Sequence, residues 1–306
     1  MNTSALGPEF RSRGFVVVKG LLSAVQVEAC VDELERLSGR PRAAFEEFRI
    51  ARRLLPRPLY RGWTLPDGVT RTPAFWPLIT LPPLLEVVRE LLGNDTRFLQ
   101  HTDLHVGFSA LNWHRDSVNR QLGRSGDWDE EHEPYRLARV AFYFQSHAES
   151  GFALGLLPGS HRRGGMLPEA QLRRLERRTH PLVQALFLLA GRDPLAREAV
   201  RVATEPGDAV IFDPRLLHSG SLISGPKYSA FLAYGVPGEH FARHLHYYRH
   251  VRYELSYAAP PGDLASRLRQ AGLLADVDHL AAPADAPAYH PGAMQRLLAR
   301  AVRPRS

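Results

Sequence analysis

The sequence predicts a mainly β fold, an antiparallel sandwich or barrel, with helices added before it and within it. Three observations lead to this prediction. From about residue 96 onward, short apolar or alternating runs lie between turn signals, which is typical of antiparallel strands. Before residue 96, two segments have the apolar spacing of amphipathic helices. A further helical pattern interrupts the strand region at roughly residues 166–200.

The first elements are a short strand and two helices. The apolar run 14–20, bounded by glycines, predicts a strand. Ser23 and Gln26 have the spacing of a capping box, and apolar residues then recur at helical spacing until Gly39 ends the pattern. A second helix is predicted to begin at the proline pair 82–83 and to end at Gly93. Residues 40–80, between the two helices, fit neither period.

Turn signals divide the region that follows into strands. The turns are Leu-Pro-Gly-Ser at 157–160 and Glu-Pro-Gly-Asp at 205–208, and the predicted strands are 97–109, 139–145, 151–157, 209–213 and 229–236. No repeat or linker interrupts the chain, so we expect a single domain over residues 1–306. Its parts are a helical layer at 10–95, a β core at 96–255 with the helical insert, and a helical tail at 256–306.

The composition argues against nucleic-acid-binding and membrane proteins. The formal net charge is +7, but 37 of the 39 basic residues are arginines scattered along the chain, which indicates solvated faces rather than a polyanion site. There is no run of about 18 apolar residues, so no membrane span is predicted. The single cysteine, Cys30, cannot close an intrachain disulfide, and no secretory signal is recognisable at the N-terminus. We therefore expect a cytoplasmic protein.

A metal-binding pattern follows the first strand of the β core. His114 and Asp116 lie two residues apart, so in an extended segment both side chains point to the same side. His218, after the strand 209–213 and an Asp-Pro turn, is the leading candidate for a third ligand. Two imidazoles and one carboxylate on one face of an octahedral ion are typical of non-haem Fe(II) oxygenases. A second copy of the motif, His101-Thr102-Asp103, is a rival for the same role.

The remaining histidines are weaker candidates. His161 closes the Pro-Gly-Ser-His turn, for which we expect a structural role. The pair His240 and His244 could share a helical face, but no glutamate lies between them as a zinc protease motif requires. The tyrosines that follow, at 247, 248 and 253, favour a packed or substrate-lining segment.

Several motifs in order resemble the phytanoyl-CoA dioxygenase family of Fe(II)/2-oxoglutarate oxygenases over roughly residues 10–255. They are Gly-Phe-Val-Val-Val-Lys-Gly-Leu-Leu-Ser near the start, Trp-His-Arg-Asp at 113–116, Leu-Pro-Gly-Ser-His at 157–161, Gly-Asp-Ala-Val-Ile-Phe-Asp at 207–213, and His218. The resemblance implies a double-stranded β-helix core of the jelly-roll, cupin-like kind. It also implies Fe(II) held by His114, Asp116 and His218, with 2-oxoglutarate as cosubstrate and O2 as oxidant.

The expected cosubstrate anchor departs from the family pattern. The family usually places an arginine after the second iron-binding histidine, where this sequence has Lys227-Tyr228-Ser229, nine residues beyond His218. Lysine can bind the distal carboxylate of 2-oxoglutarate as a point charge. We expect Ser229 and Tyr228 to add hydroxyl groups and His105 to lie near the cosubstrate. The alternative is that Lys227 is a surface residue after the Gly-Pro turn.

The resemblance implies an oxidoreductase that hydroxylates a small molecule, with release of succinate and CO2. Desaturation, epoxidation and ring closure stay open, whereas Asp116 disfavours halogenation because related halogenases have a small residue there. A small molecule of secondary metabolism is the expected substrate. We also expect the acidic segment 124–136 to act as a mobile lid, with Trp128 and Tyr135 over the substrate. The alternative function is a catalytically silent jelly-roll protein that binds an anionic partner.

Overall fold

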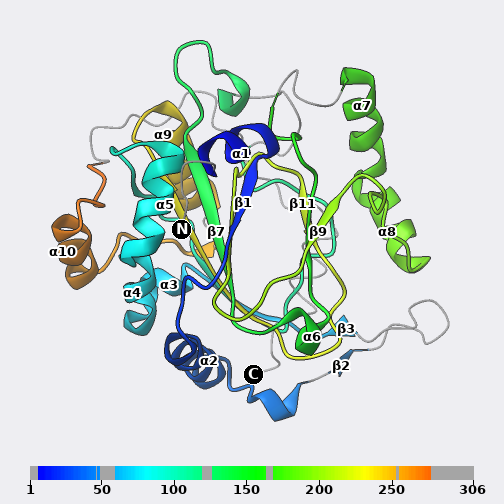
Figure 1. Ribbon diagram of the computed structural model, residues 1–306, viewed down its shortest axis with the longest axis horizontal. Helices are drawn as coiled ribbons and strands as arrows, with labels where there is room; N and C mark the ends of the chain where they lie inside the picture. Colours follow the sequence, from blue (N-terminus) through cyan, green and yellow to red (C-terminus); the bar gives the residue numbers. More distant parts are fainter. Residues whose placement is uncertain are drawn as a thin grey trace.

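Two antiparallel sheets form the centre of the computed structural model, which describes residues 6–45, 47–48, 59–118, 126–162, 168–252 and 255–276 (Figure 1). The larger sheet has the order β1 (Phe15–Val18), β10 (Ala209–Phe212), β7 (Leu137–Tyr143), β12 (Tyr228–Gly235), β6 (Asp103–Val106) and β4 (Trp63–Pro66), with β5 (Arg97–Phe98) paired to β12. The smaller sheet has the order β11 (His218–Gly220), β8 (Leu154–Leu156) and β9 (Val200–Val202). A separate two-stranded sheet joins β2 (Glu47–Phe48) to β3 (Leu59–Tyr60).

Both faces of the larger sheet are covered. Every residue of β7 is buried, and successive side chains enter different hydrophobic clusters. Ala141 and Tyr143 pack toward the smaller sheet with Leu154 and Leu156, whereas Val140 and Phe142 pack on the opposite side. This alternation follows from the two-residue period of a strand. The larger sheet therefore separates two hydrophobic clusters. One lies between the two sheets, and the other, called the outer core below, lies on the opposite face of the larger sheet.

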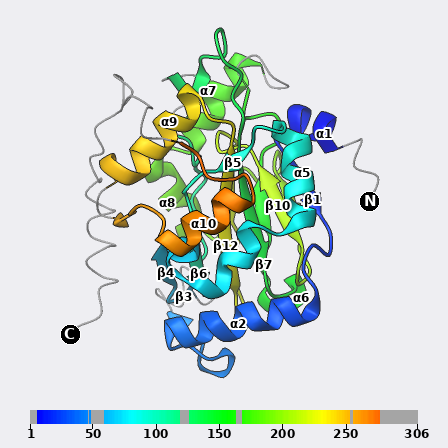
Figure 2. The ribbon, with the colours of Figure 1, turned by 90° about the vertical axis from the view of Figure 1, so that its left-hand side faces the viewer.

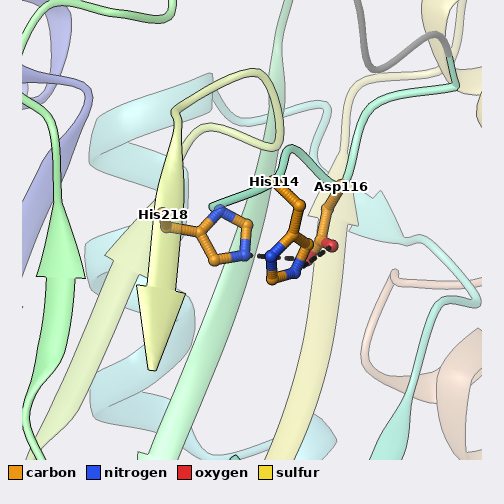
Figure 3. Close-up of side chains that lie close together, drawn as sticks. All are labelled: His114, Asp116 and His218. Atoms are coloured by element: carbon orange, nitrogen blue, oxygen red, sulfur yellow. Dashed lines mark ion pairs between the residues drawn. The ribbon is translucent and has the colours of Figure 1, made fainter. Parts of the chain in front are cut away.

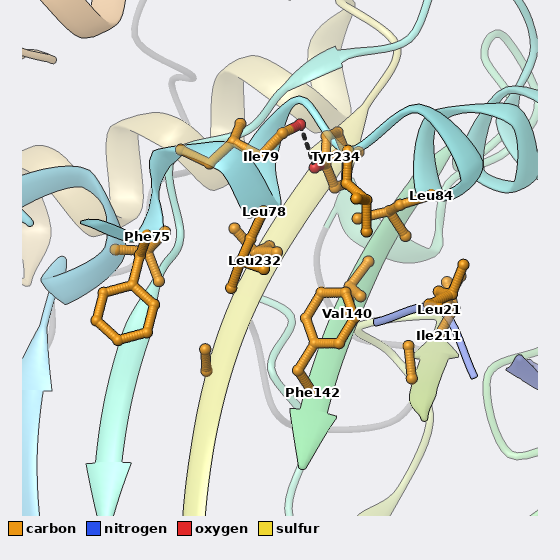
Figure 4. Packing of buried hydrophobic residues seen from close by; sticks show 14 of the residues in the cluster. Leu21, Phe75, Leu78, Ile79, Leu84, Val140, Phe142, Ile211, Leu232 and Tyr234 are labelled. Carbon is orange, nitrogen blue, oxygen red and sulfur yellow. Dashed lines mark hydrogen bonds between the residues drawn. The ribbon is translucent and has the colours of Figure 1, made fainter. Parts of the chain in front are cut away.

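Helices cover the outer face of the larger sheet (Figure 2). The α-helices are α1 (Leu6–Arg13), α2 (Ala24–Ser38), α3 (Gly68–Arg71), α4 (Trp76–Ile79), α5 (Pro82–Leu92), α6 (His147–Ser150), α7 (Glu169–Arg178), α8 (Pro181–Leu189), α9 (Glu239–His246) and α10 (Gly262–Gln270). Shorter 3-10 turns are Arg42–Ala44, Pro73–Phe75 and Gly126–Trp128, and a π-helical turn, Tyr247–Val251, continues α9. Apolar side chains of α2, α4, α5 and α10 belong to the outer core. Within it, the Tyr234 hydroxyl donates to the Ile79 carbonyl at 2.7 Å (Figure 4).

The two predicted N-terminal helices are present. Ser23 caps α2 through the predicted capping box with Gln26, and Gly39 ends the helix in the left-handed conformation at φ 64°. The helix α5 begins at the predicted proline pair and is followed by Gly93. In the insert, α7 and α8 stand beside the smaller sheet, and β9 follows at residue 200 (Figure 1). The expected tail contains α10, and residues 277–306 lie outside the described part.

Two local predictions are wrong. The run 97–109 forms two strands, β5 and β6, because the backbone leaves the sheet between them, and His101 therefore lies outside a strand. Trp128 and Tyr135 do not cover a substrate site, because both are buried against the guanidinium of Arg215. The described part of the expected lid is also anchored, since Glu133 accepts a hydrogen bond from the backbone of Glu239. Residues 124 and 125 lie outside the described part.

Tyr228 is a further correction, because it faces the outer core rather than the space between the sheets. Its hydroxyl donates to Glu35 of α2 at 2.7 Å, and its ring belongs to the outer hydrophobic cluster. Lys227 and Ser229, one position before and one after, face the other way. Tyr228 therefore ties the central strand β12 to α2 and has no contact with the expected cosubstrate site.

We predict that Tyr228→Phe lowers the free energy of unfolding by about 1–2 kcal/mol, because it removes one hydrogen bond to a carboxylate. Denaturant titration measures this change. The same variant leaves the dependence of activity on 2-oxoglutarate unchanged. A raised Michaelis constant for 2-oxoglutarate, with stability unaffected, would return Tyr228 to the cosubstrate site.

Candidate active site

The site lies between the two sheets, in a cavity of about 330 Å³. Side chains of β6, β7 and β12 line one wall, and β8, β11 and the segment 108–116 line the other. Both rival motifs reach it, since His101 and Asp103 line the cavity together with His114, Asp116 and His218. The volume lies at the lower end of the range for small-molecule pockets.

His114 and His218 are joined by their own backbones. They form an isolated antiparallel bridge in which each amide donates to the other's carbonyl at 2.9 Å. This pairing brings the two imidazole rings to a centroid separation of 4.3 Å. Asp116 is held next to them because its amide donates to the Pro214 carbonyl at 2.8 Å. The segment that carries the motif is therefore fixed along the chain that leads into β11.

The two imidazoles are held in the same tautomer. Nδ1 of His114 lies 2.8 Å from the Asn112 carbonyl, and Nδ1 of His218 lies 2.9 Å from the Leu216 carbonyl. A carbonyl can only accept, so each Nδ1 donates and each Nε2 keeps its lone pair for a metal. These Nε2 atoms lie 3.8 Å from the two Asp116 carboxylate oxygens, His114 facing Oδ1 and His218 facing Oδ2 (Figure 3).

Charge favours an ionised Asp116. Burial by itself would raise the pKa of this carboxyl, but the neighbouring His218 and Arg139 more than offset that effect and hold the pKa well below its usual value. Two neutral nitrogens and one carboxylate, within 4.8 Å of one another, fit the donor set of a non-haem iron(II) site. Among the described residues, this is the one group of histidine, cysteine and acidic side chains that can hold a metal ion.

The rival histidines have other partners. His101 contacts His244, with Nδ1 of the first 3.0 Å from Nε2 of the second, and its ring stacks on Tyr248 at 3.6 Å. His240 instead contacts the Glu133 carbonyl, at 3.1 Å from Nε2, so it does not form a zinc site with His244. His161 is buried and bonds to the Arg11 carbonyl, in line with the structural role expected for it.

Lys227 is a buried cation at one end of the cavity. Only 2% of it is exposed, its Nζ hydrogen-bonds to the Ser229 hydroxyl at 3.0 Å, and no described carboxylate pairs with it. The rings of Phe152 and Tyr143 lie 4.6 and 5.4 Å from Nζ. Burial lowers the pKa of Lys227 to about 7. An unpaired ammonium in an apolar pocket suits a ligand carboxylate, which fits the distal end of 2-oxoglutarate.

His105 borders the same end of the cavity. Its position on β6 is directly opposite Ser229 of β12, and its ring lies 5.0 Å from the ring of Phe231. Burial lowers its pKa, and Lys227 and Arg139 lower it further, so the imidazole is neutral. His105, Lys227 and Ser229 are therefore neighbours, and their contact with a cosubstrate stays a prediction.

Sequence reasoning missed Arg139, which is buried on β7 and lines the cavity. It lies within a strand whose other residues are all apolar or aromatic, and this isolated charge was the available signal. Sequence reasoning also missed the support for the metal motif. Gln184 of α8 hydrogen-bonds to both the amide and the carbonyl of Trp113, and the Trp113 indole donates to Asp193 at 2.8 Å. The helical insert thus holds the residue that precedes His114.

The family profile "Phytanoyl-CoA dioxygenase (PhyH)" matches residues 10–228 of the chain. Among solved structures, HygX from Streptomyces hygroscopicus with nickel, 2-oxoglutarate and hygromycin B bound is 20% identical, with a TM-score of 0.51 over 76% of this chain and 86% of that chain. The same protein with iron bound is 19% identical, with a TM-score of 0.52 over 76% and 86%.

A third solved structure is the non-haem α-ketoglutarate-dependent carbocyclase SnoK from nogalamycin biosynthesis. It is 15% identical, with a TM-score of 0.50 over 76% of this chain and 83% of that chain. No curated protein matches the sequence. These likenesses confirm the predicted jelly-roll fold class. Separately, no helix in the described ranges has the length and apolarity needed to cross a bilayer.

We predict that His114→Ala, Asp116→Ala and His218→Ala each weaken Co(II) binding at least about a hundredfold, because each would remove one of the three ligand atoms predicted to hold the ion. Isothermal titration measures the affinity, and circular dichroism checks the fold. The matched control is His161→Asn, which changes a buried histidine outside the cavity. Wild-type Co(II) affinity in any of the three alanine variants would contradict the assignment of that ligand.

Proposed function

The chain belongs to the phytanoyl-CoA dioxygenase family, and on that premise we propose that it hydroxylates a small organic molecule. It is an Fe(II)- and 2-oxoglutarate-dependent oxidoreductase. The structure is consistent with this activity, because three side chains that can hold a metal ion meet in one cavity: His114, Asp116 and His218. Fe(II), when bound with 2-oxoglutarate and O2, supplies the oxidising power to remove hydrogen from a C–H bond, with succinate and CO2 as coproducts. The observation that carries the proposal is a group of two histidines and one aspartate that can hold a metal ion, beside a buried lysine that pairs with no carboxylate in the described part of the chain.

The protein groups divide the work of binding. His114, Asp116 and His218 would hold the metal, and Lys227 with Ser229 would orient the distal carboxylate of 2-oxoglutarate. The aromatic rings of Tyr143, Phe152 and Phe231 line the cavity around Lys227 and give it apolar walls there. A dry site strengthens the attraction between the Lys227 ammonium and a carboxylate. These contacts would fix the cosubstrate relative to the metal.

The part of the lining that does not surround Lys227 is left for the substrate. It includes His101, Asp103, Tyr248, Arg252 and Leu255, a mixture of polar, aromatic and aliphatic groups. A small, polar natural product is the substrate class that we propose. Two solved structures of this fold support it, one with hygromycin B bound and one of an enzyme of nogalamycin biosynthesis. A compound of secondary metabolism is the working assumption, in a cytoplasmic setting.

Anaerobic titration tests the proposed chemistry directly. Adding 2-oxoglutarate to the Fe(II)-loaded protein should produce a weak visible metal-to-ligand charge-transfer band, and candidate substrates should then stimulate succinate formation. A protein that binds an anionic partner but has no catalytic function would give neither signal. Absence of the band at saturating Fe(II) and 2-oxoglutarate would refute the proposal.

We predict that Lys227→Ala raises the Michaelis constant for 2-oxoglutarate about ten- to a hundredfold, because a charge-assisted contact contributes about 1.5–3 kcal/mol. Lys227→Arg should restore part of the affinity, since arginine is also a cation but has a larger, planar head group. Lys19→Ala is the matched control, because Lys19 is the sequence's only other lysine and is exposed, pairing with Asp208. Equal 2-oxoglutarate dependence in Lys227→Ala and wild type would exclude Lys227 as the anchor.

The affinity for 2-oxoglutarate should also fall as the pH rises above about 7. Burial lowers the pKa of Lys227 to about 7, so its side chain is a charged ammonium below this pH and a neutral amine above it. Because a bound carboxylate raises that pKa, affinity should fall by up to about tenfold per pH unit until the pKa of the complex is reached. Binding to the Ni(II)-loaded protein at pH 6–9 measures the effect. Lys227→Arg, which stays charged, should flatten the dependence, and a wild-type profile without slope would contradict it.

A further inference from the structure

Arg139 connects the metal motif to the rival motif. It is 3% exposed and faces two carboxylates, with Nη2 3.0 Å from Asp103 Oδ2 and Nε 3.3 Å from Asp116 Oδ2. Its Nη1 donates to the His101 carbonyl. The guanidinium is therefore fixed on two sides by residues 101 and 103, and its remaining edge is directed at Asp116.

The Nε atom of Arg139 is a buried donor with no hydrogen-bond acceptor in suitable geometry. The Asp116 carboxylate oxygen at 3.3 Å is an ion-pair partner of this atom. Arginine offers its donors in a rigid planar fork, so its other contacts dictate where Nε points. Of the two Asp116 oxygens, Oδ1 faces Nε2 of His114 at 3.8 Å, whereas Oδ2 lies between Nε2 of His218 at 3.8 Å and the closer Nε of Arg139 at 3.3 Å.

We propose that Arg139 is a positioning residue that holds Asp116 through Oδ2, so that Asp116 offers the metal one oxygen rather than two. A carboxylate that chelated through both oxygens would take up an additional coordination position. Three protein ligand atoms would leave positions open on an octahedral ion, which 2-oxoglutarate and O2 need. Asp103 contributes to the same positioning, because its carboxylate holds the Arg139 guanidinium in place. This inference rests on the proposed metal site and concerns residues outside the metal-binding set.

The second His-x-Asp motif thereby gains a role other than metal binding. His101 contributes its backbone carbonyl and Asp103 its carboxylate, and both act on Arg139 rather than on a metal ion. The Tyr257 hydroxyl lies 3.4 Å from Asp103 Oδ1 and completes the support of that carboxylate from the far side. The cavity wall at this end is thus a chain of contacts that ends at Asp116.

The test compares Arg139→Met, Arg139→Lys and Asp103→Asn in the full chain, loaded with Co(II) and without 2-oxoglutarate. The ligand-field absorption spectrum of Co(II) reports the coordination of the ion. We expect Arg139→Met to change this spectrum while Co(II) affinity stays the same or rises, because a cation has been removed from beside the metal. Subsequent titration should show 2-oxoglutarate affinity lowered about tenfold or more. Arg139→Lys should recover part of the wild-type spectrum, and Asp103→Asn should change it in the same direction as Arg139→Met but less.

The control is Arg243→Met, which removes another buried arginine facing an aspartate, Asp127, outside the cavity. A merely structural role of Arg139 would lower Co(II) and 2-oxoglutarate affinity together and would overturn the proposal. A folded Arg139→Met with the wild-type Co(II) spectrum and 2-oxoglutarate affinity would also overturn it. If Arg139→Met does not fold, Asp103→Asn decides, since an unchanged spectrum in that variant contradicts the proposal. Failure of the wild-type protein to bind Co(II) would instead refute the proposed function.

Discussion

The backbone bridge between His114 and His218 is the contact on which the site depends. Two reciprocal hydrogen bonds of 2.9 Å join a loop to the first residue of β11, at the edge of the smaller sheet. Because main-chain atoms make these bonds, the two rings meet whatever substrate is present. The adjacent carbonyls then fix the ring tautomers through Nδ1. The side chains are therefore pre-organised by the fold, so that little conformational entropy is lost when a metal ion or a ligand binds.

The cavity uses two buried cations in opposite ways. Arg139 is neutralised by two carboxylates, and this satisfies the general requirement that a buried charge be paired. Lys227 lacks such a partner in the described part of the chain, and burial lowers its pKa. A paired cation is suited to hold a neighbouring side chain, whereas an unpaired one is suited to bind a charged ligand. The same electrostatic rule thus separates a positioning residue from a binding residue.

Several features of the fold and of the site can be predicted from local sequence patterns. The capping box at Ser23, the His-x-Asp spacing and the unusual lysine at 227 each rest on local residues, and local rules are sufficient to interpret them. Tyr228 could also have been placed correctly, because strand side chains alternate and Lys227 and Ser229 share the opposite face. The partners of Arg139 could not be predicted, since Asp103 and Asp116 reach it only through strand pairing and the approach of the two sheets. Long-range pairing of this kind has no signal in a single sequence.

The residues that line the cavity do not all lie within the part of the chain that matches the family. The matched residues, 10–228, include the metal triad, Lys227 and Arg139. Of the lining proposed for the substrate, His101 and Asp103 lie within that range, whereas Tyr248, Arg252 and Leu255 follow it. Tyr248 is presented by a π-helical turn that continues α9, a backbone feature often found at functional sites, and its ring stacks on His101. The residues that would hold the metal and the cosubstrate therefore lie inside the family match, whereas part of the lining proposed for the substrate lies beyond it.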